Sequence, residues 1–189
     1  MQNYEIIRSS RKTLALQING DRVLVRAPLK TPQEVIERFV AEHRDWIESH
    51  LAKNAEKMKK LAAVEPLSQL ELKALVKKAK QVIPQRTAYY AELMGLTYGR
   101  IAIRSQHTKW GSCSAKGNLN FNCLLMLAPP DVLDSVIVHE LCHRVEMNHS
   151  KRFYALLYRY YPDYDNCHKW LKENGDTLMA RLDNMPNRR

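Results

Sequence analysis

The stretch VHELCHRVEMNH, residues 138–149, contains residue types suited to metal chemistry. His139 and His143 are four positions apart, and on an α-helix this spacing places two side chains on one face, about 40° and one turn apart. Two imidazoles in this arrangement can bind one ion, which is the geometry of HExxH zinc sites. Glu140 is rotated by roughly 100° from His139, so its carboxylate would lie beside the ion and could accept a proton from water.

A third ligand is needed, because a catalytic zinc site usually has three protein ligands. The candidate is His149, which follows His139 at a distance that would rotate it by about 280° on one continuous helix. The sequence therefore predicts that the helix ends soon after His143 and that the chain turns back. Asn148 suits a left-handed conformation at this reversal, and Ser150 suits the cap of a following helix.

The residues around the motif are apolar, so the helix is expected to be largely buried. Burying two histidines and a glutamate in such a helix costs free energy unless their polar atoms have partners, and a metal ion would provide one. The alternative is a pair of core histidines with ordinary hydrogen-bond partners. His107 and His168 are expected at the surface or behind the ligands, and Cys142 is expected to be a packing residue.

The elements that must position the motif follow from periodicity and turn signals. Residues 4–27 predict two strands joined at 19–21, and a helix then runs from Pro32 to about Lys60, with Thr31 as its cap. Further elements are expected as a helix over 68–94 that Pro84 kinks or splits, strands near 96–105 and 118–127, and helices over 130–147, 150–160 and from 165 onward. Gly95 is expected to end the second helix. The pattern predicts an α+β fold with one region over residues 1–62, a β-hairpin plus helix, and another over residues 63–189. The two regions are expected to pack as one compact unit.

Composition bounds the possible classes of protein. The chain has 189 residues, 45% of them hydrophobic and 26% charged, which is typical of a globular protein. A net charge of +10, spread along the chain, permits attraction to nucleic acid. No apolar run reaches the ~20 residues that cross a bilayer, so no membrane partner is expected. The first residues contain no signal-peptide pattern, and the four cysteines have no CxxC spacing, so a cytoplasmic protein with free thiols is expected.

Several stretches together resemble the YgjP-like metallopeptidase family, whose members are related to SprT-like zinc proteases. They are WGSCSAKGNLNFN (110–122), LAPPDVLDSVIVHELCH (127–143), MNHSKRFYALL (147–157), PDYDNCHKWLKENG (162–175) and two N-terminal stretches within 9–51. The resemblance implies a zincin-like fold over residues 63–189, in which a small antiparallel or mixed sheet packs on several helices, the HExxH helix included. It also implies one Zn²⁺ per chain, with His139, Glu140, His143 and His149 at the metal site. Tyr154 stands where tryptophan is expected in many relatives.

The mechanism expected of this site is metal-assisted hydrolysis of a peptide bond in a peptide or protein. Three neutral imidazoles leave the charge of Zn²⁺ largely uncompensated, which lowers the pKa of bound water toward ~7, and Glu140 acts as the general base. An additional group usually stabilises the developing oxyanion. Tyr154, Tyr158 and Arg144 are the candidates, and packing or surface roles remain the alternative for each.

Substrate contacts are expected from the strand NLNFNCLL, which precedes the motif helix. Its Asn120 and Asn122 and its half-alternating pattern suggest that an extended peptide pairs with the edge of this strand. Trp110 begins a turn that either buttresses the cleft or contacts the substrate directly.

Two rival functions remain open beside a zinc peptidase. One is a protease associated with nucleic acid, by analogy with SprT-like proteins and because of the positive net charge. The other is a non-enzymatic metal-binding or interaction module that keeps the ligands without hydrolysis.

Overall fold

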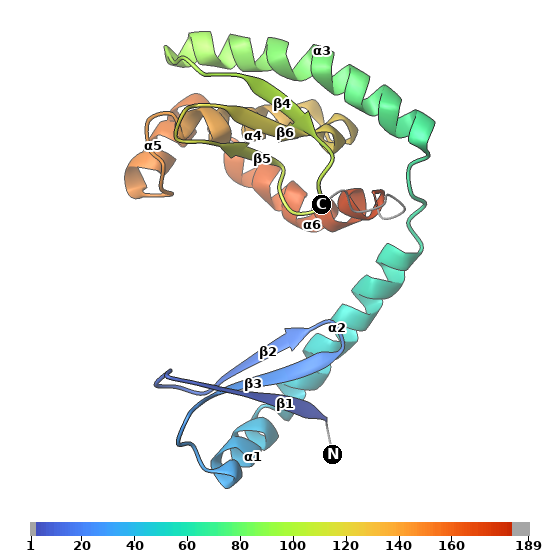
Figure 1. Cartoon of the computed structure of the whole chain (residues 1–189), viewed down its shortest axis with the longest axis vertical. Coiled ribbons are helices and arrows are strands. Elements are labelled where there is room, and N and C mark those ends of the chain that lie inside the picture. Colours follow the sequence, from blue (N-terminus) through green and yellow to red (C-terminus); the bar gives the residue numbers. More distant parts are fainter. Residues whose placement is uncertain (1–2, 183–189) are drawn as a thin grey trace. The chain divides into compact units, whose positions relative to one another are not determined.

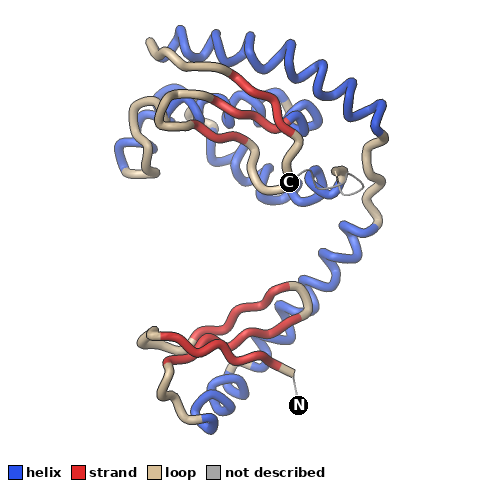
Figure 2. The backbone as a smooth tube through the Cα atoms, in the orientation of Figure 1, coloured by secondary structure: helices blue, strands red, loops and turns tan. Residues whose placement is uncertain are grey.

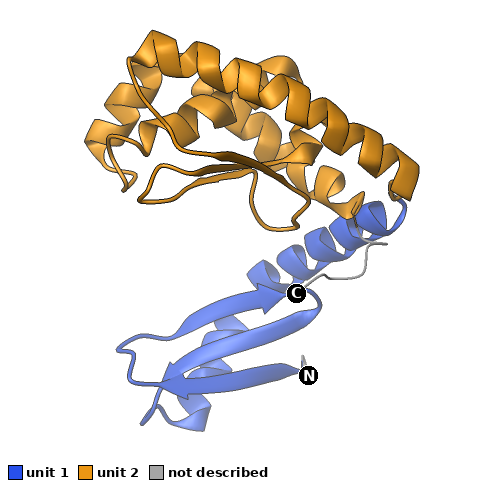
Figure 3. Cartoon of the chain, turned by 45° about the horizontal axis from the view of Figure 1, so that its top comes forward, with its two compact units in different colours: residues 1–63 blue, residues 64–189 orange. Residues whose placement is uncertain are grey.

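The computed structural model describes residues 3–182, and it has the α+β class that the sequence predicts. The chain divides into two compact units, residues 1–63 and residues 64–189, which are distinguished by colour in Figure 3. Each unit has its own three-stranded mixed sheet and its own hydrophobic core. Among the described helices, none has both the length and the apolar character that crossing a membrane requires.

The first unit is a three-stranded sheet covered by two helices. Its elements are β1 (Tyr4–Ser9), β2 (Ala15–Asn19), β3 (Arg22–Pro28), α1 (Gln33–Glu42) and α2 (Arg44–Ala62). The hairpin of β2 and β3 was expected, but residues 4–27 form three strands rather than two, because β1 pairs in parallel with the other edge of β3. Alternate residues of β3, Val23 and Val25 among them, are buried against Ile36 and Ile47 of the two helices.

The single helix expected from Pro32 to Lys60 is interrupted at His43. This residue has φ −107° and ψ 18°, outside the helical range, and its Nδ1 lies 2.8 Å from the carbonyl oxygen of Phe39. The expected cap at Thr31 is also wrong. Helix α1 begins after Pro32 without a side-chain cap, and the backbone N–H of Thr31 donates to the Pro28 carbonyl at 3.2 Å.

The second unit contains the histidine motif. Its elements are α3 (Gln69–Met94), β4 (Ile101–Arg104), β5 (Gly111–Cys113), β6 (Leu119–Asn122), the 3₁₀ helix η1 (Cys123–Leu127), α4 (Pro130–Cys142), α5 (Lys151–Tyr160) and α6 (Tyr164–Ala180). Helix α3 is continuous through Pro84, so the expected split is absent. It begins at a Ser68–Glu71 capping box, ends at Gly95 with φ 64°, and lies alongside β4 (Figure 1).

The sheet of this unit has the order β4-β6-β5, so β6 is the central strand (Figure 2). It pairs in parallel with β4 on one edge and antiparallel with β5 on the other. The hypothesis that a substrate pairs with the edge of NLNFNCLL is therefore wrong, because both edges of this strand are already hydrogen-bonded. Among the described residues, the outer edge of β5 has no strand beside it.

Helix α4, which carries the motif, contacts α3, α5, α6 and β5. It starts with Pro130 in its first turn, as the sequence predicts. Asp134 is 5% exposed and forms a two-pronged ion pair with Arg86 of α3. The hydroxyl of Tyr90 donates to the same carboxylate at 3.2 Å. This buried network ties α4 to α3, and so gives the motif a rigid support.

Candidate metal centre

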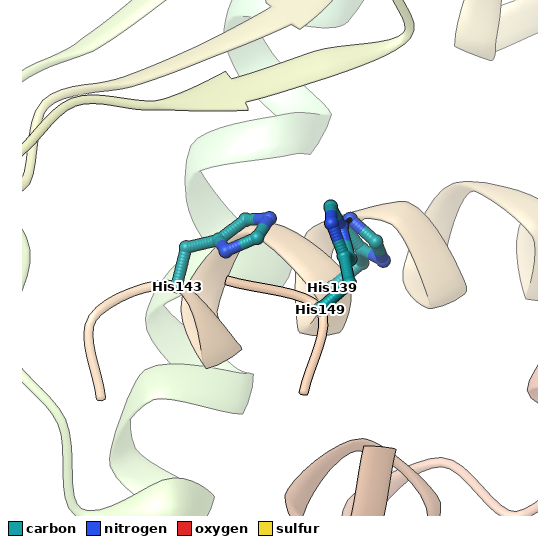
Figure 4. Close-up of side chains that lie close together, drawn as sticks. All are labelled: His139, His143 and His149. Atoms are coloured by element: carbon teal, nitrogen blue, oxygen red, sulfur yellow. Dashed lines mark hydrogen bonds between the residues drawn. The ribbon is translucent and has the colours of Figure 1, made fainter. Parts of the chain in front are cut away.

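The three histidines of the motif converge at the end of α4 (Figure 4). Their ligand atoms all lie within 4.8 Å of one another, and Nε2 of His139 is 3.1 Å from Nε2 of His149. Two nitrogens on one tetrahedral Zn²⁺ are about 3.3 Å apart when both Zn–N bonds are ~2.0 Å. The spacing of the Nε2 atoms is therefore close to the spacing that zinc requires.

The chain reversal that brings His149 to the cluster is built from successive turns. Helix α4 ends at Cys142, whose carbonyl accepts the backbone N–H groups of Val145 and Glu146 at 3.0 Å each. The expected left-handed conformation of Asn148 is wrong, since only glycines have positive φ in the described part of the chain. The Ser150 cap is confirmed, because its hydroxyl accepts the N–H of Phe153 at 3.3 Å.

Two of the three imidazoles have a protein partner at Nδ1. The Nδ1 of His143 lies 3.1 Å from the carbonyl oxygen of Glu146, and this oxygen can only accept a hydrogen bond. His143 therefore has its hydrogen on Nδ1, which leaves the lone pair of Nε2 free. The Nδ1 of His139 lies 3.1 Å from the hydroxyl of Tyr164, a residue that the sequence did not single out.

Their surroundings favour the uncharged form of His139 and His143, which is the form that binds metals. Burial, reinforced by the neighbouring His143 and His149, lowers the pKa of His139 to about 3. Burial also lowers the pKa of His143. Because a metal binds the neutral imidazole, these environments favour the ligand state at neutral pH without a prior loss of protons.

Phe153 packs against the cluster, and sequence reasoning missed it. Its ring centroid lies 4.9, 4.7 and 4.8 Å from those of His139, His143 and His149, and the side chain is completely buried. It follows the Ser150 cap by three residues, which turns it toward the protein interior. An apolar ring here limits the orientations open to all three imidazoles and excludes water from one side of the cluster.

Glu140 lies on the buried side of α4, next to β5. It is 5% exposed, and burial raises its pKa to about 8. A Cβ atom on Gly111 would lie 2.6 Å from the Oε1 of Glu140, 2.7 Å from its Cγ and 2.9 Å from its Cδ. The carboxyl group therefore occupies space that exists because residue 111 has no side chain. The sequence indicated only a turn at this glycine.

Gly111→Ala is expected to displace the Glu140 carboxyl group and to lower kcat for peptide hydrolysis by about 10²-fold, since misplacing a reacting group by ~1 Å has this effect. The three histidines are not displaced, so zinc affinity should stay at the wild-type value. Ser112→Ala, a change at the next residue of β5 with its side chain on the other face of the sheet, is the control. Steady-state kinetics that show equal kcat for Gly111→Ala and wild type would contradict this role of Gly111.

The three oxyanion candidates lie in different surroundings. Arg144 is already engaged, because its Nε donates to the Thr97 carbonyl at 3.0 Å and its guanidinium packs over Gly117. Tyr154 and Tyr158 are 37% and 38% exposed on α5, with their rings stacked 6.1 Å apart. The ring of Tyr154 lies 6.4 Å from that of His149, whereas the Tyr158 hydroxyl donates to Asp165 at 2.8 Å. Of the three, Tyr154 contacts the cluster.

The remaining candidates for substrate contact each interact with other parts of the protein. Asn122 is completely buried, and its amide donates to the carbonyls of Gln106 and Lys109 at 2.7 and 3.1 Å. Asn120 donates to the Ser112 hydroxyl at 3.1 Å, on the face of the sheet opposite to Gly111. The Trp110 ring packs closely over Gly175 of α6. Asn122 therefore holds the loop before β5, and its buried side chain is not placed to contact a substrate.

A comparison with models of protein families identifies the family that this chain resembles over most of its length. The model of the YgjP-like family, described as a metallopeptidase domain, matches residues 12–73 and 67–174. The chain belongs to the YgjP-like family. It is thus a member of a metallopeptidase family, as the resemblance in the sequence implies. No curated protein matches it.

Two solved structures resemble part of this YgjP-like chain. One is the metallopeptidase zymogen jannalysin of Methanocaldococcus jannaschii, with 20% identity and a TM-score of 0.45 over 50% of this chain and 97% of its own. The other is the metallopeptidase zymogen abylysin of Pyrococcus abyssi, with 14% identity and a TM-score of 0.44 over 49% of this chain and 94% of its own.

The residues of the YgjP-like chain fit a metal ion. The cluster supplies nitrogen donors only, which suits zinc better than magnesium or calcium. His149 is exposed, so the site is open to solvent on that side. His168 lies outside the cluster and stacks on Tyr164, and Cys142 is buried with its pKa raised to about 12, as expected of a packing residue.

Proposed function

We propose that this YgjP-like protein is a zinc-dependent peptidase of the HExxH type, with one zinc ion held by His139, His143 and His149. The convergence of their ligand nitrogens within 4.8 Å carries the proposal. It is supported by Glu140, which follows His139 directly on α4, is buried, and has its carboxyl group in the space beside Gly111. Three protein ligands with an open side are the arrangement of a catalytic zinc site.

In the proposed reaction, Glu140 moves the protons. Zinc held by His139, His143 and His149 would polarise the substrate carbonyl and lower the pKa of the attacking water. The charge of a bound metal ion would favour the ionised form of Glu140 against the burial that raises its pKa. The Glu140 carboxylate then takes a proton from the water as the water oxygen forms a bond to the carbonyl carbon. Glu140 then gives the proton to the nitrogen of the leaving amine as the C–N bond breaks. A carboxyl group held out of bulk water suits both steps, because its proton is exchanged with the reactants rather than with solvent.

A peptide substrate can lie along the outer edge of β5. Ser112 of β5 is opposite Asn120 in the ladder, and this strand contains Gly111, which contacts Glu140. An extended peptide added to this edge would gain main-chain hydrogen bonds while its backbone passes beside the general base. Tyr154 borders the cluster on the α5 side, and we propose that it contacts the substrate or the developing oxyanion.

Removal of the metal tests the proposed function. Protein treated with a chelator is expected to lose hydrolysis of an unstructured protein such as casein, and one equivalent of zinc should restore it. Metal content by mass spectrometry should change from one zinc per chain to none and back. Hydrolysis that survives complete removal of the metal would contradict the proposal.

The same experiment separates the two rival functions. Restored metal with no hydrolysis under any condition favours a binding module. Hydrolysis that requires added DNA, together with a DNA affinity that falls steeply with salt, favours a nucleic-acid-associated protease. The net charge of +10 is the observation behind that second candidate. A cytoplasmic location stays a prediction from the N-terminal sequence.

A further inference from the structure

Tyr164 and His139 approach each other across 25 positions of sequence, at a point where the proposed metal site meets α6. The Tyr164 hydroxyl lies 3.1 Å from Nδ1 of His139, and the two rings are nearly parallel, at 16°. We propose that Tyr164 is a positioning residue for the metal site. Its hydroxyl accepts the Nδ1–H of His139 and so holds the imidazole with the lone pair of Nε2 toward the other two histidines. This inference rests on the zinc site proposed above.

The tautomer of His139 decides whether it can be a ligand. A neutral imidazole has one nitrogen that donates and one that accepts. The Nε2 of His139 faces the Nε2 of His149 at 3.1 Å, so it is the nitrogen turned toward the cluster. A metal there needs the lone pairs of both Nε2 atoms, and this places the hydrogen of His139 on Nδ1. Tyr164 is the hydrogen-bond partner that Nδ1 then requires.

The Nδ1 atoms of His143 and His139 have different kinds of hydrogen-bond partner. The carbonyl of Glu146 imposes one tautomer on His143, since a carbonyl oxygen never donates. A tyrosine hydroxyl can donate or accept, so it tolerates both tautomers of His139. Binding of the metal fixes the hydroxyl as the acceptor. Outer partners of this kind orient the ligand ring and raise its basicity.

The position of the hydroxyl is set by several independent contacts. Tyr164 is the first residue of α6 and is 9% exposed. Its ring stacks on His168 at 5.6 Å and meets the edge of Tyr158 at 6.4 Å. The phenol is therefore held in place by its own helix and by the rings that pack against it.

The alternative is that Tyr164 only fills space behind His139. Tyr164→Phe separates the two roles, because it keeps the ring and its stacking and removes only the hydroxyl. Tyr161→Phe is the matched control. It removes a hydroxyl that is three residues away and donates to a carbonyl of the same helix, α4, without contact to a ligand histidine.

The experiment measures zinc affinity by competition with a chromophoric chelator, and the visible absorption of the cobalt(II)-loaded protein. Tyr164→Phe is expected to bind zinc about 10–100-fold more weakly than wild type and to alter the cobalt spectrum, as the loss of an outer-shell partner does. Tyr161→Phe should match wild type in both readouts while losing thermal stability. Equal affinity and equal spectra for Tyr164→Phe and wild type would overturn the role of Tyr164.

A second measurement needs no variant and covers the case in which Tyr164→Phe does not fold. The ¹⁵N chemical shifts of histidine in the zinc-loaded wild-type protein report which ring nitrogen is protonated. The expected result for His139 is a protonated Nδ1 with slow solvent exchange of its hydrogen. Coordination through Nδ1 overturns the inference and leaves the zinc site intact, whereas a wild-type protein that binds neither zinc nor cobalt overturns the proposed function and this inference together.

Discussion

Glu140→Gln is expected to lower kcat/KM for peptide hydrolysis by about 10²–10⁴-fold, the usual contribution of a positioned general base. Glutamine has nearly the same size and shape as glutamate, so it fits the space beside Gly111. It cannot take up a proton from water, and the proton-transfer steps lose their carrier. Steady-state kinetics on a peptide substrate measure the loss.

The same variant should still bind one zinc ion per chain, because the three histidines are unchanged. Asp131→Asn is the matched control, since it makes the same carboxyl-to-amide change at an exposed position of the same helix. This control should retain wild-type kinetics. Unchanged hydrolysis in Glu140→Gln would remove Glu140 from the mechanism, and loss of zinc together with activity would show instead that Glu140 supports the metal site.

His149→Ala is expected to weaken zinc binding by more than the roughly 10–100-fold that removal of an outer partner costs, because it removes a ligand itself. Two ligands, His139 and His143, would remain, one fewer than a catalytic zinc site uses. His149 is exposed, so its loss should leave the fold intact and the metal-free melting temperature near that of wild type. Competition with a chelator and metal content by mass spectrometry give the affinity and the stoichiometry.

His168→Ala is the control for this change. His168 is also exposed and is close enough to His139 to lower its pKa, but it does not belong to the cluster. Because His168 stacks on Tyr164 and is not a member of the cluster, its replacement should weaken zinc binding far less than His149→Ala does. If His149→Ala binds zinc as wild type does, or if His168→Ala loses the metal instead, then the third ligand is a different residue.

Part of the site could be predicted because it depends on local geometry. The four-residue spacing of His139 and His143 determines that both project from one face of any helix that contains them. The expectation that the chain turns back after His143 also follows from this geometry, since no straight helix brings His149 to the same face. The Ser150 cap and the Gly95 helix end are local in the same sense, and the structure confirms both.

Other features could not be predicted because they depend on pairing between distant segments. Strand β6 reads as a half-alternating strand, yet its central place in the sheet depends on where β4 and β5 lie. The local sequence likewise does not indicate the parallel pairing of β1 with β3 or the break at His43. Asn148 suited a left-handed turn by residue type, but successive main-chain hydrogen bonds to Cys142 begin the reversal without one.

The sequence by itself determined the class of chemistry, through two histidines and a glutamate placed by helix periodicity and a third histidine within reach of a reversal. Only the tertiary structure decided which groups surround them. Phe153, Tyr164 and Gly111 lie on three other elements, and each acts through a contact with the motif that depends on how those elements pack. Helix periodicity fixes relations within about two turns, whereas such contacts depend on how elements pack together. For that reason the identity of the ligands could be read from the chain, and the environment that orients them could not.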